Sequence, residues 1–82
     1  MDRNVRALCT KTISLLREER ERQKLSKYFV AQESGLSPQM IAYVENGERN
    51  PTLETVMRIA SALKVDLAQI IKRAQKEAGR TK

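Results

Sequence analysis

Histidine is absent from this sequence, and cysteine occurs once, at Cys9. A single cysteine excludes a disulfide bond within the chain. With one thiol and no imidazole, the usual zinc sites and the usual nucleophile–base pairs lack their side chains. We therefore expect neither an enzyme nor a bound metal or other cofactor, and we expect Cys9 to be a small buried hydrophobic residue.

Long apolar runs are also missing. No segment approaches the length of a membrane span or a signal-peptide core, so we expect a cytoplasmic protein. The two prolines and three glycines each fall where a helix would begin or end. No stretch alternates apolar and polar residues over four to eight positions, as a half-buried strand would. The pattern predicts an all-α fold.

Positive charge is the first feature that is present in excess. The 82 residues are enough for one domain, residues 1–82, and carry 16 Lys and Arg against 10 Asp and Glu, a net charge of +6. This balance favours a polyanionic partner such as nucleic acid. A solvated basic surface without a partner explains it as well.

The first predicted helix covers about residues 5–23. Its apolar positions recur at three- and four-residue steps, which predicts one buried stripe: Val5, Leu8, Cys9, Thr12, Ile13 and Leu16. Ser26 and Ser37 are typical N-caps of two short helices, residues 27–34 and 38–46. Gly35 separates them, because the residue after a helix commonly needs a positive φ.

Two more helices follow. Thr52 is the expected cap of the fourth, with a predicted stripe made of Leu53, Val56, Met57, Ala60 and Leu63. Asp66 with Gln69 resembles a capping box for the fifth, with an apolar face made of Leu67, Ile70, Ile71 and Ala74. The ends of the chain, residues 1–4 and 79–82, are expected to fray.

Residues 26–46 form a unit of helix, turn and helix. Ile41 and Val44 are expected to anchor its second helix to the core. The outward face is then made of Pro38, Gln39, Ala42, Tyr43 and Asn46. This face has no acidic residue to repel phosphates, and its amides and phenol can reach base edges in a major groove.

The sequence here resembles the phage-repressor and Cro-like (XRE-type) helix-turn-helix family over roughly residues 13–71. The resemblance rests on "LSKYFVAQESGLSPQMIAYVENGERNPTLETVMRIASALKVDLAQII". It includes the Leu-Ser start, the turn glycine, the Glu-x-Gly end of the next helix, the Asn-Pro-Thr-Leu loop and an Ala-x-x-Leu helix. It implies a compact five-helix, lambda-repressor-like DNA-binding domain.

By this resemblance, two groups of residues contact DNA. The expected base readers are Ser37, Pro38, Gln39 and Tyr43. The expected phosphate contacts are Lys27, Asn46, Arg49 and Asn50. Glu45 is expected to pair with an arginine of the first helix, Arg20 or, one turn earlier, Arg17, in a structural role.

Plainer interpretations exist for several of these residues. Tyr43 could lie flat over aliphatic neighbours, and Gln39, Lys27 and Arg49 could be ordinary solvated side chains. Pro38 stands where relatives often carry a polar base reader, so one contact could be lost or replaced by apolar contact with a thymine methyl.

Tyr28 and Phe29 depart from the family, whose members carry polar residues at these two positions. One of the two rings could pack against the first helix. The alternative is an exposed patch for a partner protein or for self-association.

The resemblance implies a transcriptional regulator that acts by occupancy as a homodimer on a near-palindromic operator, such as a repressor or an autoregulatory controller. The chain is as small as Cro-type repressors and restriction–modification controller proteins. The expected dimer interface is the part of Leu67, Ile70, Ile71 and Ala74 that the monomer core leaves uncovered. The alternative function is a protein-interaction module, such as an antitoxin. RNA binding is a third possibility, although no aromatic stacking platform is evident.

Overall fold

The computed structural model describes residues 2–79, which form five helices. They are α1 (Asp2–Arg22), α2 (Lys27–Ser34), α3 (Pro38–Glu45), α4 (Leu53–Leu63) and α5 (Leu67–Gly79). No strand occurs among these residues, so the predicted all-α class is confirmed. α1 begins three residues earlier than the predicted position 5. Residues 1–4 and 79–82 were expected to fray; residues 2–4 belong to α1 and residue 79 to α5, and residues 1 and 80–82 lie outside the described part of the chain.

Local capping explains where the helices begin. The hydroxyls of Ser26, Ser37 and Thr52 each accept a hydrogen bond from the backbone N–H three residues ahead, at 2.9–3.1 Å. Each bond satisfies one of the amide groups that a helix N-terminus leaves unpaired. Asp66 caps α5 through the N–H of Ala68, at 2.9 Å, rather than through that of Gln69. These four starts agree with the sequence prediction.

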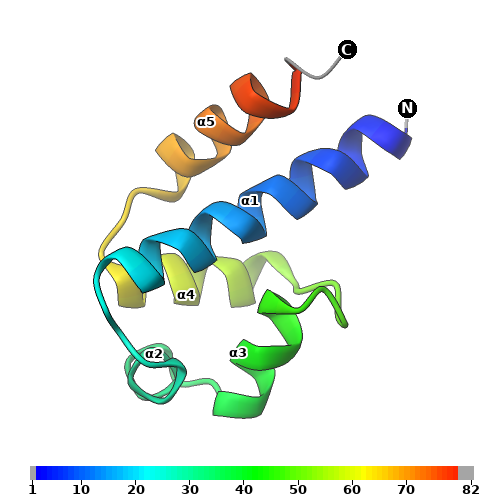
Figure 1. Cartoon of the computed structure of the whole chain (residues 1–82). Helices are drawn as coiled ribbons and strands as arrows, with labels where there is room; N and C mark the ends of the chain where they lie inside the picture. Colours follow the sequence, from blue (N-terminus) through cyan, green and yellow to red (C-terminus); the bar gives the residue numbers. More distant parts are fainter. Residues whose placement is uncertain (1, 80–82) are drawn as a thin grey trace.

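The helices form a long pair that lies over a cluster of short helices (Figure 1). α1 and α5 run side by side, α3 and α4 lie against the second half of α1, and α2 packs on α3 and α4. The core between them contains Leu15, Leu16, Val30, Ala31, Ile41, Val44, Ile59, Ala60, Leu63, Ile70 and Ala74. α3 therefore has one face on the core and one face outward.

The predicted buried stripe of α1 is partly wrong. Val5 is 54% exposed and Cys9 is also exposed, whereas Leu15, which the stripe omitted, is 1% exposed. The short helices pack only under the second half of α1, so the first turns are covered on one side at most. Cys9 is therefore not the buried hydrophobic residue that the sequence suggested.

The predicted stripe of α4 is wrong at its start. Leu53 and Met57 are 68% and 55% exposed, and Ile59 takes a core position instead. α4 carries apolar residues on more than one face, so its periodicity does not decide which face is buried.

No helix within residues 2–79 is long and apolar enough to cross a lipid bilayer.

Candidate nucleic-acid interface

The turn between α2 and α3 is fixed by Gly35. Its φ of +78° is left-handed, and its N–H and that of Leu36 both donate to the carbonyl of Ala31. The Arg58 guanidinium of α4 lies directly over the turn: a Cβ at position 35 would be 3.3 Å from its Nη1. The same Nη1 donates to the Ser34 carbonyl at 3.2 Å. Arg58 thus caps the C-terminus of α2, a role that sequence reasoning missed because the two residues are far apart in the chain.

The far end of α3 is fixed by Glu45. Arg20 of α1 donates from Nε and Nη2 to the two carboxylate oxygens of Glu45, at 2.7 and 3.0 Å. Both side chains are nearly buried, with 11% and 8% exposure. The hydrogen bonds to Glu45 raise the pKa of the Arg20 guanidinium above its ordinary value, while burial opposes the shift.

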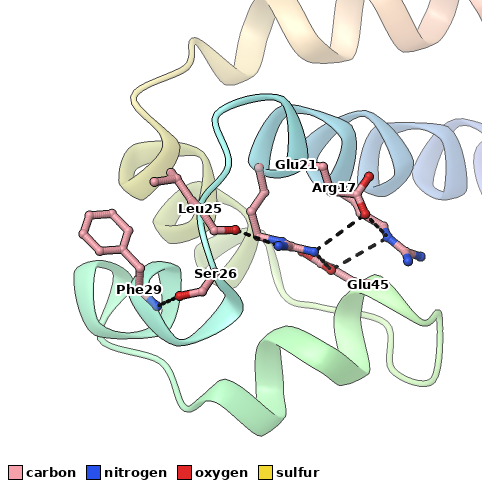
Figure 2. Close-up of polar contacts among 7 residues, drawn as sticks. Arg17, Glu21, Leu25, Ser26, Phe29 and Glu45 are labelled. Carbon is pink, nitrogen blue, oxygen red and sulfur yellow. Dashed lines mark hydrogen bonds and ion pairs between the residues drawn. The ribbon is translucent and has the colours of Figure 1, made fainter.

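Arg20 also contacts the segment before α2. Its Nη1 donates to the Leu25 carbonyl at 2.8 Å, next to the Ser26 cap (Figure 2). Arg17 lies at the edge of the same cluster, 3.9 Å from Glu45 and 3.3 Å from Glu21 (Figure 2). The sequence left Arg20 and Arg17 as alternative partners of Glu45, and the structure shows that Arg20 is the main one. One buried guanidinium therefore holds both helices of the helix-turn-helix against α1.

The predicted base readers lie on the outer side of α3. Pro38 and Gln39 are exposed in its first turn. Ser37 caps the helix, with its Oγ accepting from the Met40 N–H at 3.0 Å, which leaves the hydroxyl proton free to donate. Tyr43 is half-buried, and its hydroxyl accepts a hydrogen bond from Gln39 Nε2 at 2.6 Å.

The predicted phosphate contacts flank α3 on both sides. Lys27 is the first residue of α2 and is half-buried. Asn46 is the C-cap of α3, and Arg49 and Asn50 are exposed in the loop that follows. The exposed Glu48 of the same loop offsets part of this positive charge. The positively charged side chains of Lys27 and Arg49 therefore lie before and after α3, whose outward face carries no carboxylate.

Tyr28 and Phe29 are 61% and 41% exposed. The interpretation that one of the two rings packs away against α1 is therefore not supported, and the exposed patch remains. Among the described residues, no group of three or more His, Cys, Asp or Glu side chains could hold a metal ion.

The predicted dimer residues of α5 divide into two pairs. Ile70 and Ala74 are 8% and 0% exposed and belong to the monomer core, so they are unavailable to a second copy. Leu67 and Ile71 are only half-buried, and Leu67 still packs on the core. Of the four predicted dimer residues, Ile71 is therefore the main one that the monomer core leaves available to a second copy.

Comparison with known proteins agrees with this geometry. A family model described as helix-turn-helix matches residues 16–70, which contain all of α2, α3 and α4. A search of curated proteins gives no match. The structure is similar to the crystal structure of a point mutant of the restriction–modification controller protein C.Esp1396I, with a TM-score of 0.82. The two chains are 21% identical, and the alignment covers 92% of this chain and 97% of the other, which shows a common fold.

The family match spans the capped helices, the glycine turn and the exposed α3 face described above. The chain belongs to the XRE-type helix-turn-helix family of DNA-binding transcription regulators.

Proposed function

We propose that the protein binds a near-palindromic operator as a symmetric homodimer and regulates transcription by occupying it, as a repressor or an autoregulatory controller does. The observation that carries this proposal is the outward face of α3, which has the positively charged side chains of Lys27 and Arg49 on its two sides. The controller protein with the same fold supports the same assignment by analogy.

Base reading is assigned to the first turns of α3. Gln39 offers an amide with both a donor and an acceptor, the arrangement that pairs with a base edge in the major groove. Ser37 has a free hydroxyl proton, and Pro38 presents an apolar surface suited to a thymine methyl. Tyr43 lies one turn further along the same face, where it contacts Gln39.

Phosphate binding is assigned to Lys27, Asn46, Arg49 and Asn50. Lys27 stands at the N-terminus of α2, where free backbone N–H groups and the helix dipole also favour a phosphate. The other three residues lie at and beyond the opposite end of α3. Contacts at both ends would fix the register of α3 in the groove, which is the general role of phosphate contacts.

Specific binding and the Lys27 contact can be tested together by fluorescence anisotropy. The DNA would come from just upstream of the gene, with a scrambled sequence as the reference, across a salt series. We expect a preference of roughly a thousandfold or more. Lys27→Ala should weaken binding to both DNAs and lower the salt slope by about one per protomer, because one phosphate contact is lost.

Lys76→Ala is the matched control. Lys76 is exposed in the last turn of α5, and its replacement removes the same charge far along the chain from α2 and α3. An equal change of slope in both variants would mean that Lys27 acts only through net charge. Equal, weak binding of the wild-type protein to both DNAs would refute operator recognition.

The homodimer is assigned to α5 through Ile71 and Leu67, which are four residues apart and so lie on one side of the helix. Sedimentation velocity at tens of micromolar should show a dimer for the wild-type protein and a monomer for Ile71→Glu. Gln69→Glu places the same charge on an exposed position of the same helix and should remain a dimer. A wild-type monomer at this concentration would contradict the proposed interface.

The second candidate function is a protein-interaction module. It is favoured by the exposure of Tyr28 and Phe29, two large aromatic residues on α2. In that case, the double substitution Tyr28→Ser and Phe29→Ser would abolish co-purification of a partner protein, and the wild-type protein would not discriminate between the two DNAs. Specific DNA binding that survives this double substitution would favour the operator-binding function.

A further inference from the structure

Three residues expected to bind DNA are connected in the structure, because Gln39 and Arg49 both contact Tyr43. Gln39 Nε2 lies 2.6 Å from the Tyr43 hydroxyl oxygen, to which it donates a hydrogen bond. The Arg49 guanidinium carbon lies 4.8 Å from the centre of the Tyr43 ring. At this distance a guanidinium over an aromatic face gains a cation–π attraction. We call Gln39, Tyr43 and Arg49 the Tyr43 cluster.

The backbone brings Arg49 back to α3. After the helix ends at Asn46, the Gly47 N–H donates to the Val44 carbonyl at 3.1 Å and the Glu48 N–H donates to the Tyr43 carbonyl at 2.9 Å. With the φ of +75° at Gly47, this pair of bonds is a Schellman motif. The motif reverses the chain over the last turns of α3, so Arg49 reaches the ring of Tyr43 although it lies outside the helix.

Each contact occupies part of the Tyr43 side chain, although the hydroxyl keeps a proton that it can still donate. The hydroxyl oxygen accepts from Gln39, and one ring face lies under Arg49. Gln39 and Arg49 keep groups that can bind DNA. Gln39 retains its carbonyl oxygen and a second N–H, and the N–H groups at the edge of the Arg49 guanidinium are not used by a contact through its face.

Holding these two side chains in the free protein has a thermodynamic consequence. Long side chains such as Gln and Arg lose rotamer freedom when they bind a partner. If they are already held by Tyr43, less of that freedom is lost on binding, and affinity rises through preorganisation.

We propose that Tyr43 is a positioning residue: its hydroxyl orients Gln39 for a base edge, and its ring holds Arg49 for a phosphate. Base reading and one backbone contact then depend on the same side chain. This inference rests on the proposed operator binding.

Two substitutions of Tyr43 separate the two contacts. Tyr43→Phe keeps the ring and removes the hydroxyl, whereas Tyr43→Leu removes both. Tyr43→Phe should lower the preference for operator over scrambled DNA about tenfold and leave the salt slope unchanged. Tyr43→Leu should lower both the preference and the salt slope.

Double-mutant cycles distinguish positioning from direct reading. If Tyr43 acts through Gln39, Tyr43→Phe should have no further effect on the preference in a Gln39→Ala protein. If it acts through Arg49, Arg49→Ala should weaken binding at least threefold less in the Tyr43→Leu protein than in the wild-type protein. Additive effects in both cycles would overturn the proposal, because Tyr43 would then contact DNA independently.

A measurement without DNA separates this inference from the proposed function. In proton NMR spectra of the free protein, ring currents should shift the Arg49 side-chain protons upfield in the wild-type and Tyr43→Phe proteins but not in Tyr43→Leu. Unshifted Arg49 protons in a wild-type protein that prefers the operator would refute only the positioning role. Shifted protons without any operator preference would refute only operator binding. Tyr43→Phe keeps the test decisive if Tyr43→Leu fails to fold.

Discussion

Replacing Leu63 with alanine is expected to lower the free energy of unfolding by about 2–5 kcal/mol. Leu63 is the last residue of α4 and is 1% exposed, among the most buried side chains of the core. Its truncation removes apolar contacts and leaves a cavity that the neighbouring helices fill only in part. In a domain of this size each kcal/mol lowers the melting temperature by about 4–8 °C, so thermal or urea unfolding will resolve the change.

Leu53→Ala is the matched control for this prediction. The substitution is chemically identical and lies on the same helix, but Leu53 is 68% exposed. We expect a change within about 0.5 kcal/mol. Equal losses for the two variants would contradict the burial of α4, because the sequence places both leucines on one stripe and only the structure separates them.

Replacing Arg20 with alanine is the second substitution with a large expected effect, a loss of about 3–5 kcal/mol of unfolding free energy. Arg20 makes two hydrogen bonds to Glu45 and one to the Leu25 carbonyl, and its side chain is 11% exposed. Its removal leaves the nearly buried Glu45 carboxylate without its main partner. The variant should also bind DNA less well, because Arg20 connects both ends of the α2–α3 unit to α1.

Arg17→Ala controls for the loss of an α1 arginine near the same carboxylate. Arg17 is 46% exposed and lies 3.9 Å from Glu45, so its removal should cost no more than about 1 kcal/mol. The double variant Arg20→Met, Glu45→Leu should be more stable than Arg20→Ala alone, since it leaves no buried charge unpaired. Equal effects of Arg17→Ala and Arg20→Ala, measured by urea unfolding, would show that the pair contributes only surface electrostatics.

Prediction from sequence was most accurate where a structure depends on contacts over a few residues. The N-caps at Ser26, Ser37 and Thr52 and the turn at Gly35 follow from hydrogen bonds and a φ angle within one turn of chain. The family pattern added the pairing of Glu45 with the first helix, with Arg20 and Arg17 left as alternatives. The three-point contact of Arg20 in the folded chain decided between them.

Prediction was least accurate for burial. Val5, Cys9, Leu53 and Met57 were expected inside and are exposed, whereas Leu15 and Ile59 are inside. Helical periodicity shows which residues share a face. It does not show how far along the helix a neighbour extends, nor which of two apolar faces that neighbour covers.

The sequence by itself determined the five helices, their caps and the family, because these follow from local chemistry and a recognisable pattern. Only the tertiary structure decided which apolar residues form the core, how much of α5 remains for a dimer, and that Arg58 caps α2. It also brought Gln39, Tyr43 and Arg49 together. These features depend on how helices pack and how the chain reverses after α3, so no single stretch of sequence encodes them.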